Sequence, residues 1–270
     1  MTAQFIEELP ELHTFILELA ADYNADKIDG WRAFIARVKA FYTPAMMDKI
    51  EGVAGGWGHM AAFANHQTLI HVTSVLTALP LCEEFQALDA EQQNLAWWIV
   101  LFHDIAKEAH PERLDHVHGF IGAAVTAEAL CKLDFGITLD TDEAFYRWAD
   151  MTRTALTQKA GIDDLVQDNS QLPAILDGIT ALFGDDTPAA LVIKGVLLHM
   201  SITVIPAWAQ QAPLTDADIK QYITPKLLPL LKVMMIVDGH GWALFEPERK
   251  AEETVSTRKT FAQVAQQVAG

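Results

Sequence analysis

The feature that most constrains this fold is an adjacent ionisable pair, His103-Asp104, at the end of a strongly apolar run. All eight residues at 95–102 are hydrophobic, so we expect this segment to lie in the core. Two ionisable groups that end a buried segment need partners, because an unpaired charge is costly in a protein interior. An imidazole nitrogen and a carboxylate oxygen are both good metal ligands. The sequence therefore predicts a metal ion beside this pair.

Helical periodicity dominates the chain, and alternating strand patterns are almost absent. The second predicted helix follows Asp29, whose carboxylate is expected to cap it. Four glycines at 52–58 indicate a flexible loop. The helices are expected at 10–23, at 31–41, from 44 as a short helix, at 66–79, from 89 to the ionisable pair, and at 115–133, 142–156, 172–183, 189–205 and 225–237. The pattern predicts an all-α protein.

The charge balance excludes some partners. The formal net charge is −17, from 36 acidic and 19 basic residues among 270. Nucleic-acid backbones and anionic membranes are bound through clustered Lys and Arg, so we expect neither polymeric nucleic acid nor a membrane as partner. The apolar stretch at 189–209 is interrupted by Lys194, His199 and Pro206, which favours a buried helix over a membrane span.

The N-terminus lacks the basic start and apolar stretch of a signal peptide, so a cytoplasmic location is expected. Cys82 and Cys131 form no CxxC motif, which argues against a disulfide framework and against a thiolate zinc site. We expect both cysteines to be buried thiols.

Four further ionisable residues lie in apolar surroundings on different predicted helices: His71, His118, His199 and Asp238. A helical bundle can direct such side chains to one interior point, as helical metal-carboxylate proteins do. A single buried histidine is more often a hydrogen-bonded core residue than a ligand. Two buried carboxylates, however, require compensation together, which favours a shared site.

The order of these residues resembles the H…HD…D signature of the HD-domain superfamily of metal-dependent phosphohydrolases. Segment 66–75 (HQTLIHVTSV) resembles the helix of the family's first histidine, and segment 101–107 (LFHDIAK) is similar to its HDIGK string, with Ala106 in place of glycine. Segment 118–123 (HGFIGA) matches the H-x-x-x-G-A element, and 237–242 (VDGHGW) looks like the closing aspartate. The resemblance covers about residues 65–242.

The resemblance implies an HD-domain-like helical bundle that binds metal through His71, His103, Asp104 and Asp238. Nitrogen and oxygen ligands without thiolate suit Mn²⁺, Mg²⁺, Fe²⁺, Ni²⁺ or Zn²⁺, and one or two ions are compatible with the set. The expected domains are an N-terminal helical extension at 1–58, the metal-binding helical domain at 59–245 and a polar helix or tail at 246–270.

Three more residues are candidates for the site. Lys107 either contacts Asp104 or neutralises substrate phosphate, and the alternative is a solvated lysine near a helix C-terminus. His118 could bind phosphate, protonate the leaving group or ligate a second metal; otherwise it is a hydrogen-bonded histidine in a helix's first turn. His199 is the natural further ligand of a dinuclear site, or else a plain buried histidine. Weaker candidates are His66, His110, His116, His240, Arg147, Arg153 and Lys159.

The function implied by the resemblance is hydrolysis of a small phosphomonoester or phosphodiester, with a nucleotide as the favoured substrate and a metal-activated water as nucleophile. One alternative is an HD-type di-iron oxygenase, in which further histidines complete a second iron site. Another alternative is a non-catalytic HD signalling or binding module. The presence of all four core ligands argues against such a module.

Overall fold

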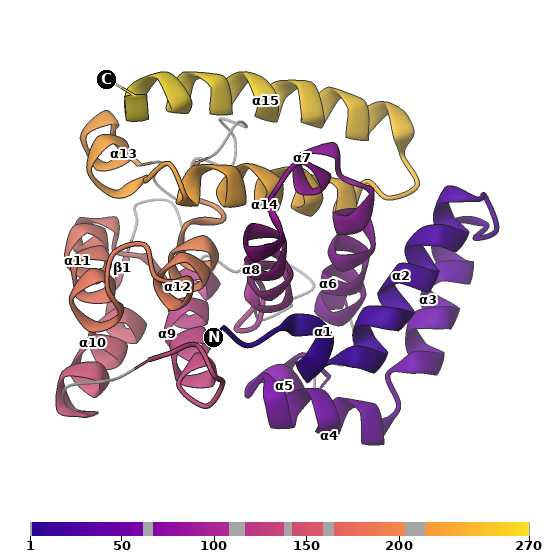
Figure 1. The fold of residues 1–270 in the computed structure, drawn as a ribbon, viewed down its shortest axis with the longest axis horizontal. Helices are drawn as coiled ribbons and strands as arrows, with labels where there is room; N and C mark the ends of the chain where they lie inside the picture. Colours follow the sequence, from indigo (N-terminus) through magenta and orange to yellow (C-terminus); the bar gives the residue numbers. More distant parts are fainter. Residues whose placement is uncertain are drawn as a thin grey trace.

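The computed structural model describes residues 2–61, 67–107, 117–137, 142–158, 165–202 and 214–269. Within these ranges nearly every element is a helix, and the predicted all-α fold is confirmed (Figure 1). The first half contains α1 (Phe5–Glu8), α2 (Pro10–Asn24), α3 (Gly30–Phe41), α4 (Pro44–Val53), α5 (Trp57–Ala61), α6 (Gln67–Ala78), the 3₁₀ helix η1 (Leu79–Leu81), α7 (Glu83–Gln86) and α8 (Ala90–Phe102).

The second half begins with α9 (His118–Leu130) and α10 (Asp142–Thr154), followed by the short strands β1 (Leu156–Gln158) and β2 (Leu165–Gln167). The remaining elements are η2 (Asn169–Gln171), α11 (Leu172–Phe183), α12 (Pro188–Leu198), α13 (Asp216–Tyr222), α14 (Leu227–Trp242) and α15 (Pro247–Ala269).

Side-chain caps explain where several helices begin. The Asp89 carboxylate accepts a hydrogen bond from the backbone N–H of Gln92 at 2.8 Å, and the two residues form a reciprocal capping box at the start of α8. At the start of α12 the Thr187 hydroxyl accepts a single capping hydrogen bond from the N–H of Ala190 at 3.2 Å. Asp29 does precede α3, but its side chain makes no capping hydrogen bond, so that prediction is wrong.

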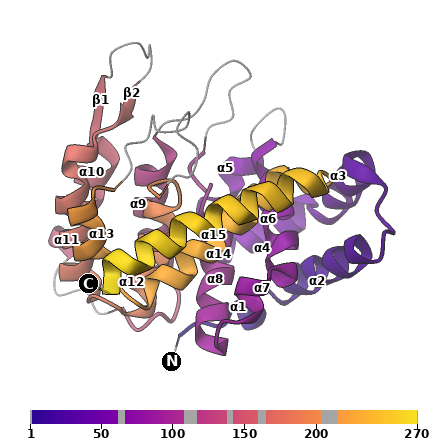
Figure 2. The same cartoon turned by 90° about the horizontal axis from the view of Figure 1, so that it is seen from above.

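Helices α6, α8 and α12 stand side by side as a central layer, each packed against the next, and α9 packs against α12 (Figure 1). Helix α14 crosses the ends of α6, α8 and α12, and α15 lies along the outer side of α14 (Figure 2). Helices α2 and α3 flank the layer beside α6, while α10 and α11 flank it beside α9 and α12. The buried hydrophobic side chains form one core cluster that runs from α1 to α15. The division into three domains stays a prediction.

Two glycines let the helices of this layer approach closely. A Cβ on Gly195 of α12 would lie 2.6 Å from Ile99 of α8, and one on Gly241 of α14 would lie 2.4 Å from Val75 of α6. Only a residue without a side chain fits such contacts. The close approach brings together helices whose ends carry the ionisable residues.

Several helix boundaries differ from the prediction. Helix α10 ends at Thr154, and the next residues form an antiparallel pair of short strands that the sequence pattern did not indicate. The glycine-rich segment is only partly a loop: Gly52 lies in α4 and Gly58 in α5, whereas Gly55 and Gly56 lie in the turn between these helices. Helix α9 begins at His118 and α12 ends at Leu198, both inside their predicted ranges.

Burial also corrects one prediction on the cysteines. Cys82 is buried as expected, but Cys131 is exposed just after α9, so the expectation of two buried thiols is wrong for Cys131. Helix α12 is buried at every residue after Pro188, and its Lys194 pairs with Asp185 at 2.8 Å. Among the described residues, no helix is both long and apolar enough to cross a membrane.

Candidate metal centre

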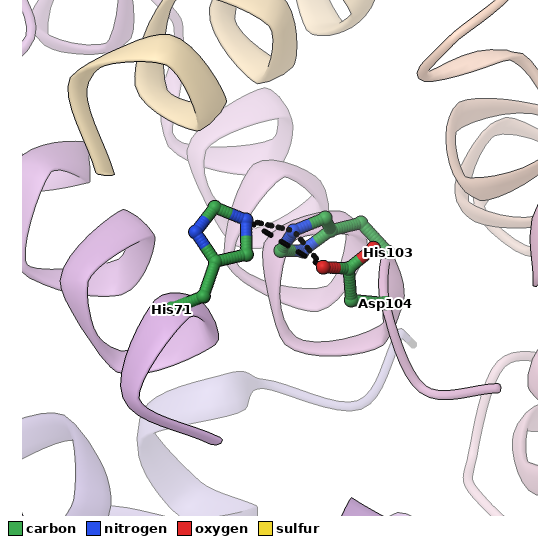
Figure 3. Close-up of side chains that lie close together, drawn as sticks. All are labelled: His71, His103 and Asp104. Carbon is green, nitrogen blue, oxygen red and sulfur yellow. Dashed lines mark hydrogen bonds and ion pairs between the residues drawn. The ribbon is translucent and has the colours of Figure 1, made fainter. Parts of the chain in front are cut away.

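His71, His103 and Asp104 lie together in the interior, where the end of α8 faces α6 (Figure 3). The Nε2 atoms of His71 and His103 are 3.5 Å apart. The Asp104 Oδ2 atom is 3.5 Å from the first and 3.6 Å from the second. All three side chains are buried. Residues that are 32 and 33 positions apart in the chain thus point at one interior place.

Asp238 reaches the same place from α14. Its Oδ1 atom is 2.9 Å from His71 Nε2 and 3.8 Å from His103 Nε2. Its side chain is 23% exposed, whereas those of the other three are almost fully buried. The four residues predicted as metal ligands are therefore neighbours, and Asp238 lies on the more accessible side.

A second group shares Asp104. The other carboxylate oxygen, Oδ1, is 3.4 Å from His118 Nε2 and 3.9 Å from His199 Nε2, and the two imidazole nitrogens are 3.3 Å apart. His118 is the first residue of α9, and His199 follows the last residue of α12. All three side chains are buried. Asp104 thus stands between two groups and turns one oxygen toward each.

Helix ends determine which nitrogen of two histidines faces the centre. His103 follows α8 and His199 follows α12, where the last backbone carbonyls have no partner within the helix. The Nδ1 atom of His103 donates to the carbonyl of Val100 at 2.7 Å, and that of His199 donates to Val196 at 2.6 Å. A carbonyl can only accept, so the proton is on Nδ1 in both rings. When neutral, each ring therefore directs the lone pair of Nε2 at the centre.

The pKa values of these groups favour the protonation states of metal ligands. Burial lowers the pKa of His103, and burial together with the neighbouring His118 lowers the pKa of His199 to about 3. Burial opposes ionisation of Asp104, but Lys107 and the histidines hold its pKa well below the usual range. The same burial acts on Asp238, and His71 outweighs it to bring the pKa to about 2. Both carboxylates are thus charged, and His103 and His199 are neutral, at neutral pH.

The donor atoms fit divalent metal ions. The Oδ1 atom of Asp104 and the Nδ1 atom of His71 are buried without a hydrogen-bond partner. The Oδ1 atom of Asp238 is also buried without one, although it lies 2.9 Å from His71 Nε2. A charged oxygen in this state is costly, and a cation would compensate it. Within each group the ligand atoms all lie within 4.8 Å of one another. Two ligands on opposite sides of an ion at about 2.1 Å each are roughly 4 Å apart, so both groups could hold a metal ion.

Two further residues touch the centre. Lys107 donates to Asp104 Oδ2 at 2.8 Å, which confirms a contact between them and contradicts the alternative of a fully solvated lysine. The indole of Trp242 stacks on the imidazole of His71, with ring centroids 4.1 Å apart and an interplanar angle of 22°. Sequence reasoning gave Trp242 no role. Its signal was the spacing of four residues after Asp238, which places both on one helix face.

The weaker candidates lie elsewhere. His240 is on α14, where its Nε2 is 2.7 Å from the Thr254 hydroxyl of α15, and burial lowers its pKa to about 4. Arg153 pairs with Glu128 at 2.7 Å, and Arg147 is exposed on α10. Four candidates fall outside the described residues: His66, His110, His116 and Lys159.

A residue that sequence reasoning missed supports the helix of His118. With its amide oxygen turned toward α9, Gln167 of β2 accepts from the N–H groups of Gly119 at 3.1 Å and Phe120 at 3.2 Å. These N–H groups lie in the first turn of α9 and have no partner within the helix. The strand pair therefore caps the helix that begins with His118.

Comparisons of the chain with family models, with curated proteins and with solved structures found no match. The function must therefore be argued from the chemistry of the centre.

Proposed function

We propose that this protein is a metal-dependent phosphohydrolase that cleaves a small phosphomonoester or phosphodiester, with a nucleotide as favoured substrate. The observation that carries the proposal is the position of Asp104, whose two oxygens face two groups of histidine nitrogens. Asp104 would therefore contribute a ligand oxygen to each group, and divalent ions held there would supply an activated water and polarise a phosphoryl oxygen. The order of the ligands in the chain, which resembles the HD-domain signature, supports the same class.

His71, His103, Asp104 and Asp238 would hold one ion, and Asp104, His118 and His199 a second. A bound divalent ion supplies a water of lowered pKa and polarises a phosphoryl oxygen. The protein keeps the imidazoles of His103 and His199 oriented through their Nδ1 hydrogen bonds to backbone carbonyls.

Lys107 adds a positive charge at the edge of the centre. It holds Asp104 Oδ2, and its side chain is 24% exposed, so it lies between the buried carboxylate and solvent. In this position it favours a dianionic phosphate group over a neutral ligand. If a single ion is bound, His118 is the residue placed to protonate the leaving oxygen, because its Nε2 lies beside Asp104 Oδ1.

Metal content and phosphoesterase activity test the proposal together. Stripped protein reloaded with Mn²⁺, Ni²⁺ or Fe²⁺ should hydrolyse para-nitrophenyl phosphate or its bis ester. His103→Ala and Asp104→Ala should lose both metal and activity. His240→Gln is a matched control on α14, because His240 lies close in sequence to Asp238 but binds Thr254 instead. Full metal content in either alanine variant would show that the site is assigned wrongly.

The number of ions can be read from single variants. His199→Ala should leave one bound ion per chain if His118 and His199 hold a second, whereas Asp104→Ala should leave none.

The second group also keeps the di-iron oxygenase as an alternative function. Two irons per chain with an absorption band in the visible range and no phosphoesterase activity would favour that oxygenase. Protein without metal under every loading condition would favour a binding module.

A further inference from the structure

We propose that Trp242 is a stacking platform that binds an aromatic ring carried by the phosphoester, and so determines which phosphoesters the centre prefers. This inference rests on the proposed function for the phosphate half of the ligand. The aromatic half rests on the position of the indole alone.

Trp242 belongs to the mouth of the centre rather than to the core. It ends α14, four residues after Asp238, and its indole stacks on the imidazole of His71. The residue is nevertheless 42% exposed. Among the tryptophans of the described residues, Trp242 alone is exposed. A large aromatic group is costly to leave in water, so an exposed indole against a metal-ligand histidine points to a ligand-binding role.

The indole is held in place before any ligand arrives. His71 covers one face of the indole through the stacked contact, and the adjacent Gly241 packs directly on Val75 of α6. The Ser74 hydroxyl of α6 donates to the carbonyl of Gly241 at 2.9 Å. A preorganised ring loses little conformational entropy when a second ring stacks on it.

A cation links the indole to the carboxylate of the centre. The Nζ atom of Lys107 lies 5.3 Å from the centroid of the Trp242 ring and 2.8 Å from Asp104 Oδ2. A phosphate held by Lys107 and the metal ligands would therefore carry its organic substituent beside the indole. A planar aromatic substituent gains stacking energy there, whereas an alkyl or sugar substituent of similar size gains less.

The ligand chemistry could come from a nucleobase or from a simple aryl group. Phosphonates allow binding to be measured without catalysis, because their P–C bond is not hydrolysed. We would titrate Mn²⁺-loaded protein with phenylphosphonate, cyclohexylphosphonate and methylphosphonate by calorimetry. The phosphonate analogue of adenosine 5′-monophosphate tests the nucleobase in the same assay. The variants are Trp242→Phe, which keeps a ring, and Trp242→Leu, which does not. Tyr146→Leu removes another exposed aromatic side chain, on α10, as a control.

Wild-type protein and Tyr146→Leu should bind phenylphosphonate about tenfold more tightly than methylphosphonate, with cyclohexylphosphonate close to the latter. Trp242→Leu should bring this ratio close to one at unchanged Mn²⁺ content, and Trp242→Phe should retain most of it. An adenosine analogue that binds more tightly than phenylphosphonate would identify the ring as a nucleobase, and the reverse would identify a simple aryl group.

If Trp242→Leu still binds phenylphosphonate about tenfold more tightly than methylphosphonate, the proposal is overturned. It is also overturned if the variant loses Mn²⁺ and both ligands weaken equally, because Trp242 would then only hold His71 in position. A second measurement needs no variant to fold. Phenylphosphonate should quench the tryptophan fluorescence of the wild-type protein more than methylphosphonate does, and equal quenching would also overturn the proposal. Absence of hydrolysis with an intact ratio would refute the phosphohydrolase and leave the stacking platform standing.

Discussion

Gly241→Ala should weaken both the fold and the candidate metal centre, because Gly241 is where α14 touches α6. An added Cβ would lie 2.4 Å from Val75 Cγ2, 3.0 Å from the Val75 backbone nitrogen and 3.2 Å from Ser74 Oγ. Carbon atoms in ordinary contact are about 3.5–4.0 Å apart. Rotation of the valine side chain can relieve the first contact but not the second. The two helices must therefore separate by a few tenths of an ångström.

The expected size of the effect follows from two opposing terms. Overpacking of a filled interior costs about 1–3 kcal/mol, and the contact with backbone places this site toward the upper end. Alanine in a helix is about 1 kcal/mol more favourable than glycine. The net loss is about 2 kcal/mol, which lowers the melting temperature of a domain of this size by roughly 4–8 °C.

The matched control is Gly52→Ala. Gly52 lies in α4, and an added Cβ there meets nothing within 4 Å, so this variant should be neutral or slightly stabilised. Scanning calorimetry measures the stability of both variants. Metal titration should show Mn²⁺ affinity reduced about tenfold in Gly241→Ala alone, because α6 carries His71 and α14 carries Asp238. Equal melting temperatures for the two variants would refute this account of the helix contact.

Three further predictions follow from single interactions. Saturating Mn²⁺, at about 100 times its dissociation constant, should stabilise the protein by about 2.7 kcal/mol in thermal melts, and His103→Ala should abolish this gain. Partial burial acts to raise the pKa of Glu84, but Arg258 outweighs it and lowers the pKa to about 2. The Glu84 ion pair therefore stabilises the fold at neutral pH and is lost as pH falls from about 4.5 to about 2. Melts at pH 7 and pH 3 should show Arg258→Gln destabilised more at pH 7; an equal deficit at both would contradict this. Burial raises the pKa of Cys82 to about 11, so a Cys131→Ser variant should react with a thiol reagent at pH 8 only after denaturation.

Local sequence signals predicted most of the helices, because capping residues and hydrophobic periodicity are local properties of the chain. Asp89 begins α8 with a capping box, and the helix predicted at 172–183 is α11 with the same bounds. For residues 246–270 the sequence predicts a polar helix or tail. The structure shows a helix, because Phe261 and Val264 are buried in the core cluster. That burial depends on the packing of α15 against α13 and α14, which a local pattern does not show.

The wrong predictions fall where the local pattern is weak or ambiguous. Gly52 and Gly58 read as loop residues, yet both are helical, since exposed helices tolerate glycine at a modest cost. The paired strands at β1 and β2 are only three residues each, which is too short for an alternating pattern to be recognised. Cys131 follows an apolar helix, but it lies beyond the last helical turn and is exposed.

The sequence by itself determined the candidate ligands. An ionisable pair after an apolar run, with His71 before it and Asp238 after it, requires compensation wherever the helices place it. Only the tertiary structure decided how that compensation is arranged. Whether His199 is a core histidine or a member of the centre depends on the distance between α12 and α8, which Gly195 sets through its contact with Ile99.

The same holds for the geometry around Asp104. Its two oxygens face different groups because α6 and α14 lie on one side of it and α9 and α12 on the other. Trp242 becomes part of the site because α14 crosses α6 closely enough for its indole to reach His71. Residue type and order are local properties of a chain, whereas ligand convergence depends on helix crossings, and those are set by contacts between residues far apart in sequence.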